Sequence, residues 1–301
     1  MAIIHSPVTT DAMNDNRIAS GAVLVIGVVS FDTLHIAGQV HHTLGGAGLY
    51  TALAARFVGA NVTLVAPRPH TLSPMLERVA QRVTWFGPTT DEAYMPRLAV
   101  AHHGEGKATL LEASWGAEQW LNASHLPQDL SRFDVVHIAA LSSAQKMLDL
   151  LRACRARGAR RISAGTYYRI VRDEPATVRA IFEQADLFFM NENEARTLWG
   201  DLRVVGRVAG RVRQDALLFI TFDRRGAIVV AGDSAMPIPA DPANEVDPTG
   251  AGDTFCGAVI GALAQGSEVF EAARNAAVVA ARAIEHVGPA FLLGAPLLAE
   301  R

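Results

Sequence analysis

The stretch Asp247-Pro248-Thr249-Gly250-Ala251-Gly252-Asp253-Thr254 joins a glycine turn to the start of a helix and places a carboxylate at the junction. A helix is predicted because apolar residues recur after the turn at the spacing of one helical face, namely Phe255, Val259, Ala262 and Leu263. The first N–H groups of a helix have no partners within it, and the helix dipole adds positive charge there. Gly250, Ala251 and Gly252 can therefore bring amide donors close to an anion, for which phosphate is the expected candidate.

Asp253 follows these amides directly. A carboxylate would repel a bound phosphate, but it is well suited to take a proton from a hydroxyl group that attacks the phosphate. An acidic residue in the first turn also stabilises many helices that have no catalytic role, so the spacing alone fits both interpretations.

The octapeptide closely resembles the C-terminal motif of the ribokinase/PfkB carbohydrate kinase family, in which the aspartate after Gly-Ala-Gly is the catalytic base. The resemblance implies an enzyme that moves the γ-phosphoryl group of ATP to a hydroxyl group of a small sugar or nucleoside. Asp253 would be the base, and the amides of Gly250, Ala251 and Gly252 would stabilise the charge on the transferred group.

Composition limits the alternatives. The 301 residues are 50% hydrophobic, which is enough for a large buried core, and the net charge of −3 gives no electrostatic reason to expect nucleic acid or an anionic membrane as partner. Two cysteines, Cys154 and Cys256, lack the spacing of metal ligands or disulfides, which suits a reducing cytoplasm. Residues 1–20 contain no apolar run and are expected to form a mobile tail, with one kinase domain over residues 21–301.

Short apolar runs alternate with helical patterns along this domain, which predicts an α/β fold with a mostly parallel sheet covered on both faces. Strands are predicted at residues 23–29, 62–66, 135–138, 161–164, 187–190 and 217–221. Helices are predicted at residues 48–58, 143–157, 176–184, 192–199 and 268–286. The resemblance implies that these elements form a ribokinase-like three-layer α/β/α sandwich.

Two segments, at about residues 33–42 and 93–112, do not follow this alternation. The second has the pattern of a strand, a polar turn at residues 102–106 and another strand. In the ribokinase-like family, insertions at these places form a small β-sheet lid over the acceptor that often pairs with a second subunit. The resemblance therefore implies a lid and a homodimer, although two surface hairpins would give the same pattern.

The acceptor site is expected near the N-terminus. Asp32 comes shortly after the first predicted strand, and Gly45-Gly46 opens the next helix, which is similar to the family's first motif for binding the acceptor hydroxyls. A carboxylate can accept two hydrogen bonds from a diol, but an isolated aspartate after a strand is also common in turns. Tyr50 stands where the family commonly has an asparagine, and its ring slightly favours a nucleoside because it could pack on a base.

Arg169 is a further candidate for acceptor binding. It ends the stretch Ala164-Gly165-Thr166-Tyr167-Tyr168-Arg169, which occupies the place of an Asp-x-Asn-x-Arg-like motif in many family members. The basic residue is retained and the acidic and amide residues are not. The acceptor class therefore stays open between sugar and nucleoside.

Asn191 and Glu194 match an Asn-x-x-Glu motif that organises Mg²⁺ and phosphate in the family. The same spacing forms a helix capping box, which needs no metal ion, and both roles can coexist. The sequence thus predicts a capped helix, and the resemblance adds Glu194 as a residue that helps to hold Mg²⁺.

Residues 221–226 resemble the family's Thr-x-Gly-x-x-Gly nucleotide loop, with Thr221 and Gly226 retained and Asp223 in place of the first glycine. The resemblance assigns this loop, with Asn191, to ATP, and it places the alanine-rich helix at residues 268–286 beside the adenine. The substitutions at Tyr50 and Asp223 also leave room for a sugar- or nucleoside-binding regulator that has kept the fold without turnover.

Other nucleotide-binding motifs are missing from the sequence. Neither Lys107 nor Lys146 belongs to a Walker-type loop, and the first predicted strand lacks the repeated glycines of a dinucleotide site. The pair His102-His103 is expected to consist of solvated turn or lid residues, because neighbouring residues on a strand point to opposite faces.

Overall fold

The structure of the chain is a computed structural model that describes residues 21–104, 107–200 and 210–294. The tail predicted at residues 1–20 lies outside these residues. None of the described helices is long and apolar enough to cross a membrane.

The main sheet contains nine strands within the described part of the chain, in the order β15-β14-β13-β12-β11-β10-β1-β4-β6. Seven of them run parallel and include all six predicted strands: β1 (Ala22–Ile26), β4 (Asn61–Val65), β6 (Thr84–Phe86), β10 (Val135–Ile138), β11 (Ile162–Ala164), β12 (Leu187–Asn191) and β13 (Leu217–Thr221). Two antiparallel strands, β14 (Ala227–Ala231) and β15 (Ser234–Ile238), extend one edge.

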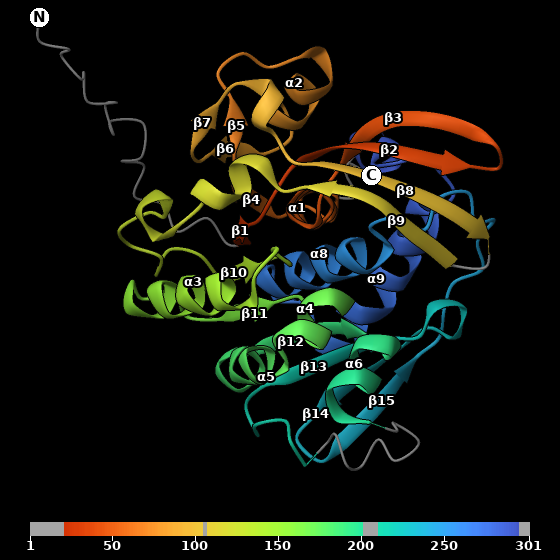
Figure 1. Cartoon of the computed structure of the whole chain (residues 1–301). Helices are drawn as coiled ribbons and strands as arrows, with labels where there is room; N and C mark the ends of the chain where they lie inside the picture. Colours follow the sequence, from red (N-terminus) through yellow and green to blue (C-terminus); the bar gives the residue numbers. More distant parts are fainter. Residues whose placement is uncertain (1–20, 105–106, 201–209, 295–301) are drawn as a thin grey trace, which may run out of the picture.

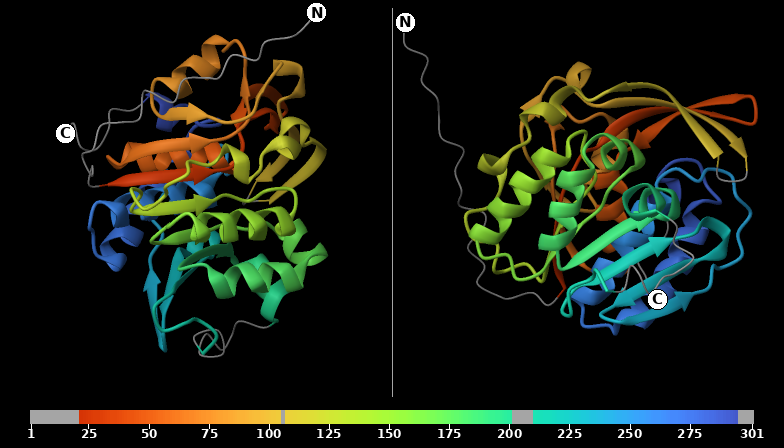
Figure 2. Two further views of the ribbon diagram at one scale, coloured as in Figure 1. Left: turned by 90° about the vertical axis from the view of Figure 1, so that its left-hand side faces the viewer. Right: turned by 60° about the horizontal axis from the view of Figure 1, so that its bottom comes forward.

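Helices cover both faces of this sheet (Figures 1 and 2). One face carries α1 (Ala47–Phe57), α8 (Ala251–Ala264) and α9 (Val269–Ala283), and the other carries α3 (Ala144–Ala156), α5 (Pro175–Gln184) and α6 (Glu192–Trp199). Successive residues of β1 point to opposite faces, so that Val23 and Val25 enter one hydrophobic core while Leu24 and Ile26 enter the other. Strands buried on both faces explain the continuous apolar runs, and the three predicted layers are confirmed.

The two segments that do not follow the alternation form a separate four-stranded sheet, called the small sheet below. Its strand order is β3-β2-β8-β9 (Figure 1). Its strands are β2 (Ser30–Ile36), β3 (Gln39–Gly45), β8 (Arg97–Gly104) and β9 (Lys107–Ser114). The two hairpins are joined by parallel pairing of β2 with β8, so they are not independent surface hairpins. The described chain also contains short elements: β5 (Arg68–Pro69), β7 (Thr89–Thr90), α2 (Pro74–Ala80), α4 (Tyr168–Asp173), α10 (Ala290–Gly294) and four short 3₁₀ helices.

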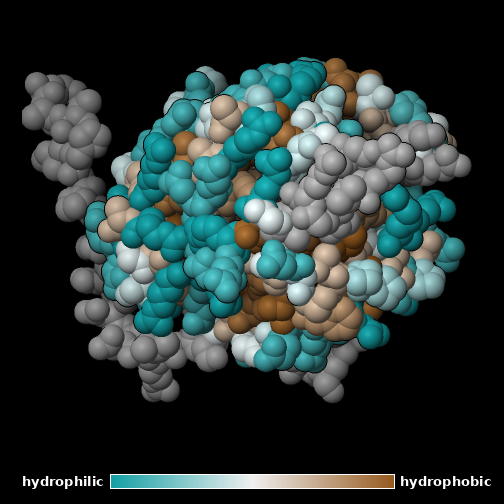
Figure 3. Space-filling model, turned by 90° about the horizontal axis from the view of Figure 1, so that it is seen from below, coloured by the Kyte–Doolittle hydropathy of each residue, from teal (hydrophilic) through white to brown (hydrophobic). Residues whose placement is uncertain are grey.

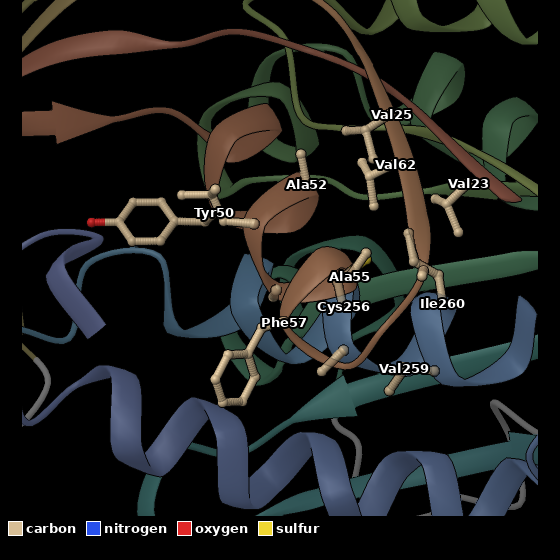
Figure 4. Packing of buried hydrophobic residues seen from close by; sticks show 14 of the residues in the cluster. Val23, Val25, Tyr50, Ala52, Ala55, Phe57, Val62, Cys256, Val259 and Ile260 are labelled. Carbon is tan, nitrogen blue, oxygen red and sulfur yellow. The ribbon is translucent and has the colours of Figure 1, made fainter. Parts of the chain in front are cut away.

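Close packing of α1 on α8 brings two distant parts of the sequence together (Figure 4). Gly257 allows this approach, because a Cβ atom there would lie 2.2 Å from the backbone oxygen of Thr51. Ala52 and Ala55 on α1 also have small side chains, which allow the two helices to approach closely. The N-terminal ends of both helices therefore belong to one region of the molecule, which is where the candidate site lies.

The face of the molecule seen from below is mixed: hydrophilic residues surround smaller hydrophobic areas (Figure 3). Such mixing is usual for protein surfaces.

Candidate active site

The glycine turn begins α8 as the sequence predicts. Gly250 is the N-cap residue and adopts a left-handed backbone with φ of 73°, and its carbonyl accepts a hydrogen bond of 2.7 Å from the amide of Thr254. Gly252 is exposed, and a Cβ atom at this position would have no other atom within 4 Å. The turn, defined as residues 247–252 and called the anion turn below, therefore places the amides of Gly250 and Gly252 at a helix N-terminus, while the amide of Ala251 donates to the carbonyl of Pro248 at 3.2 Å.

Asp253 lies in the first turn of α8 and is half-buried. Burial raises the pKa of its carboxyl group from an ordinary 3.8 to about 7. The backbone oxygen of Asp253 accepts a hydrogen bond of 3.3 Å from the hydroxyl of Thr51, which fixes the turn to α1. A carboxyl group with a pKa near neutrality suits the exchange of a proton at the same pH.

Asp32 lies within β2 of the small sheet and pairs with Thr43 of β3, two residues before Gly45. Its side chain is 3% exposed and accepts a hydrogen bond of 2.6 Å from the hydroxyl of Ser30. A Cβ atom on Gly45 would lie 1.8 Å from Oδ2 of Asp32, so only glycine leaves room for this carboxylate. Burial raises the pKa of Asp32 to about 6, and the nearby carboxylate of Asp247 contributes to the rise.

Gly46 is the N-cap residue of α1, with a φ of 99°. A Cβ atom there would lie 2.5 Å from the backbone oxygen of Val28, just after β1. The glycine pair thus allows β3, α1 and the end of β1 to meet closely beside Asp32.

Tyr50 lies on α1 and packs against the anion turn. Its side chain is 2% exposed, and its ring lies so close to Gly250 that a Cβ atom there would come within 2.4 Å of it. The hydroxyl points away from the apolar side chains around it and has no hydrogen-bond partner among the described residues (Figure 4). Burial raises the pKa of Tyr50 well above its ordinary value, and the carboxylates of Asp247, Asp32 and Asp253 raise it further.

A cavity of about 850 Å³ adjoins the anion turn. Its lining includes all four residues assigned to the nucleotide, Asn191, Thr221, Asp223 and Gly226, and it also includes Gly252. Small and apolar side chains of the segment around α9 form another part of the wall: Ala277, Ala280, Ala281 and Ile284.

Asp223 stands where the family motif has a glycine, and its backbone adopts a conformation that favours glycine. Its φ of 49° is left-handed, a region in which aspartate is tolerated better than most residues. A short 3₁₀ turn, Asp223–Arg225, follows and ends at Gly226. The loop therefore keeps a turn of the expected kind.

Glu194 forms the predicted capping box at the start of α6. Its two carboxylate oxygens accept hydrogen bonds from the backbone N–H of Asn191 at 3.0 Å and from its side-chain amide at 2.7 Å. The amide of Glu194 donates to Oδ1 of Asn191 at 2.9 Å. Burial raises the pKa of Glu194 to about 8, and the carboxylate of Asp253 raises it as well.

Arg169 takes part in none of these contacts. It lies on α4, its side chain is 52% exposed, and its Nε atom is 3.7 Å from Oδ2 of Asp173. Burial of Ile170 and Val171 on the opposite side explains why the helix forms with Arg169 at its surface.

Sequence reasoning did not find His102 as a site residue. His102 is indeed in the small sheet, but its side chain is only 6% exposed, whereas His103 is exposed as expected. Nε2 of His102 lies 3.3 Å from Oδ1 of Asp247 and 3.0 Å from Oγ1 of Thr249. These partners are about half the chain away in sequence, so no local pattern indicates the contact.

Comparison with known proteins identifies the family. The description "pfkB family carbohydrate kinase" matches residues 12–294. A 2-dehydro-3-deoxygluconokinase from Dickeya dadantii is 26% identical over 193 residues, which cover 57% of this chain and 62% of that protein. A cytidine kinase from Thermococcus kodakarensis is 26% identical over 259 residues, which cover 84% of this chain and 92% of that protein.

The crystal structure of a fructokinase from Xylella fastidiosa with bound ATP shares the fold. It matches with a TM-score of 0.76 at 20% identity, over 93% of this chain and 97% of that chain. Because the family match extends over most of the sequence and the fold agrees, the chain belongs to the pfkB family of carbohydrate kinases and is a kinase of that family.

Proposed function

We propose that this chain transfers the γ-phosphoryl group of ATP to a hydroxyl group of a small sugar or nucleoside, with Asp253 as the catalytic base. The observation that carries the proposal is the position of Asp253. Its carboxyl group lies in the first turn of α8, next to Gly252 of the cavity wall, and both Asp253 and Asp32 are near enough to Tyr50 to raise the pKa of its hydroxyl.

In the proposed reaction, the acceptor oxygen attacks the γ-phosphorus in line with the bond to the leaving oxygen of ADP. The bond between the acceptor oxygen and phosphorus forms as the bond to ADP breaks, and Asp253 takes the proton of the hydroxyl group. The amides of Gly250 and Gly252 would donate hydrogen bonds to the γ-phosphoryl oxygens as charge shifts among them, and the amide of Ala251 would join them by leaving the carbonyl of Pro248, to which it donates at 3.2 Å.

ATP would occupy the cavity. Asn191 and residues 221–226 would contact the phosphates and ribose, while the small side chains of α9 leave space for a flat, apolar base. Asp223 adopts a left-handed backbone that a glycine would also adopt, and the ring of Tyr50 packs against Gly250. Neither substitution therefore supports the alternative of a regulator without turnover.

The buried carboxyl groups of Glu194 and Asp253 influence each other electrostatically, and carboxylate oxygens are suitable ligands for Mg²⁺. Glu194 would help to hold the ion, which would neutralise phosphate charge when bound with ATP. Its capping role at α6 is compatible with this function, because the hydrogen bonds to Asn191 fix the carboxylate in place.

Asp32 would bind one or two hydroxyl groups of the acceptor, beside Gly45 and Gly46. Tyr50 is 2% exposed and packs on Gly250, so its ring offers no open face to a base and gives no reason to prefer a nucleoside. Arg169 would reach the acceptor only by leaving Asp173. Sugar and nucleoside thus remain equal candidates.

The test is ADP release from ATP and Mg²⁺ across a panel of sugars and nucleosides, with the phosphorylated product identified by mass spectrometry. The proposal expects acceptor-dependent ADP release with at least one member and stoichiometric phosphorylated product. Binding of acceptor and ATP by calorimetry without any product would contradict it, as would ADP release that is independent of every acceptor.

A further inference from the structure

His102 ties the small sheet to the anion turn. β8 carries this residue near its end, and the ends of β8 and β9 lie beside the loop between β15 and α8 in Figure 1 and in the right view of Figure 2. Nε2 of His102 lies within 3.3 Å of Asp247 Oδ1 and 3.0 Å of Thr249 Oγ1. Its Nδ1 atom is buried and has no partner among the described residues, so Nε2 alone makes the polar contacts of the ring.

Asp247 is the centre of this junction. Its side chain is fully buried, Oδ1 accepts a hydrogen bond of 2.9 Å from the amide of Thr249, and Oδ2 accepts one of 2.7 Å from the amide of Gly288. One carboxylate thus holds the start of the anion turn, the segment after α9 and the imidazole of the small sheet. Because a carboxylate only accepts, His102 contributes a donor at Nε2.

A second strand of the small sheet reaches the same junction. A Cβ atom on Gly288 would lie 2.2 Å from Oγ1 of Thr43 in β3, so this strand packs directly on Gly288. β2 lies between β3 and β8 and carries Asp32. The small sheet is therefore anchored on both sides of the proposed acceptor residue.

We propose that His102 is a positioning residue that holds the anion turn at a fixed place relative to Asp32. The inference rests on the proposed phosphotransfer, since in-line attack requires the acceptor on the small sheet and the phosphoryl group on the anion turn to be aligned. His102 touches neither ligand in this role. It acts through Thr249 and Asp247, immediately before the amides of Gly250 and Gly252.

The nucleotide cavity is lined by residues outside the small sheet. Pro248, Ala251 and Gly252 of the anion turn form only part of its wall, so loss of the His102 contact should change the Kd for ATP much less than it lowers kcat/KM for the acceptor. This separation distinguishes a positioning role from general loss of structure, which would weaken both substrates together.

The experiment compares three variants in the full chain. His102→Gln places an amide donor where Nε2 lies, His102→Asn has the same group on a shorter side chain, and His103→Asn changes the exposed neighbour on the other face of the strand. We expect His102→Asn to lower kcat/KM for the acceptor roughly 10- to 100-fold, the range for a lost hydrogen bond to a charged group. His102→Gln should recover most of this loss, and His103→Asn should equal the wild type.

Hydrogen exchange provides a readout that does not depend on turnover. In His102→Asn, the amide of Thr249 should exchange faster than in the wild type, and the Kd for ATP should stay within about threefold of the wild-type value. Wild-type acceptor kinetics in His102→Asn would overturn the inference, as would equal damage in His102→Asn and His102→Gln. A wild type that phosphorylates no acceptor would instead refute the proposed function, and faster exchange at Thr249 would then still report the contact.

Discussion

Three carboxyl groups of the candidate site have pKa values well above the ordinary range of acids. Burial raises the pKa to about 6 for Asp32, about 7 for Asp253 and about 8 for Glu194. Charged forms are disfavoured because the site is partly closed to water and because the acids repel each other. Such groups exchange protons near neutral pH, which suits a base but also makes activity sensitive to pH.

The acceptor kcat/KM should decrease as the pH falls below about 7. Only the ionised form of Asp253 can accept a proton, so each unit of pH below its pKa should lower kcat/KM about tenfold. Because Glu194 and Asp253 influence each other, the profile reports apparent values for the pair. The measurement is kcat/KM from pH 5 to 9 at saturating ATP; a flat profile between pH 5 and 8 would be inconsistent with Asp253 as the base.

Asp32→Ala should raise the acceptor KM or abolish turnover, with little effect on the Kd for ATP. A site built to bind a hydroxyl group leaves a buried partner unpaired when one group is missing. A deoxy acceptor lacking the contacted hydroxyl should therefore be a poor substrate for the wild type and should be penalised much less in the variant. Equal penalties in both proteins would place Asp32 outside the acceptor site.

Residues of the site differ in how far the sequence could predict them. Asp253 and Glu194 stand in motifs whose spacing already indicates a helix start, and the structure confirms both helices. His102 could not be predicted, because its partner Thr249 is 147 residues away and an isolated histidine in a strand has no distinctive pattern. The environment of Tyr50 could not be predicted from the sequence either, since it depends on the packing of α1 against α8.

Elements with long apolar patterns were predictable, and their ends were less so. β1 ends at Ile26 and not at residue 29, and the next residue, Gly27, passes so close to α1 that a Cβ atom there would lie 2.7 Å from Cα of Gly48. The sequence does not predict α4, because its six residues bury only Ile170 and Val171, which are too few to show a helical period. The order of the strands required pairings that a single sequence does not reveal.

The N-terminus of α8 offers a test of why glycine occurs there. Gly252→Ala should leave the melting temperature unchanged or slightly raised, because a Cβ atom meets nothing within 4 Å and alanine favours helix. It should nevertheless raise the KM for ATP if the amide of residue 252 approaches phosphate closely. Gly250→Ala is the contrasting variant: it should lower the melting temperature, since its Cβ atom would collide with Tyr50 at a φ of +73°. An unchanged KM for ATP in Gly252→Ala would show that the amide of residue 252 does not approach the phosphate closely.

At the scale of the whole molecule, packing of α1 on α8 explains how two distant motifs form one site. Gly45 and Gly46 lead into α1, while the anion turn leads into α8, and the two helices make one of the most extensive contacts of the described fold. The sequence predicts each helix but does not predict that the two helices pack against each other. The two helices can pack closely because the residues at their interface are small and because both helices are buried on the same face of the main sheet.

The small sheet leads to a prediction about assembly. β9 is an edge strand on which Leu110 and Leu111 are 48% and 56% exposed in the single chain. Unpaired edge strands with exposed apolar residues commonly serve for pairing with another chain. We expect a homodimer through this edge, which sedimentation should detect, and Leu111→Lys should shift it to monomer, whereas Met75→Lys on α2 should not. A monomeric wild type at micromolar concentration would contradict the expectation.

The central claim, that Asp253 is the base for phosphoryl transfer, is tested most directly by kcat of Asp253→Asn with the best acceptor of the panel. The substitution keeps the shape of the side chain and removes its ability to take a proton. We predict a fall of kcat by roughly a hundred- to ten-thousand-fold, the usual contribution of general base catalysis, with the Kd for ATP largely unchanged. Turnover close to the wild-type value would contradict the claim.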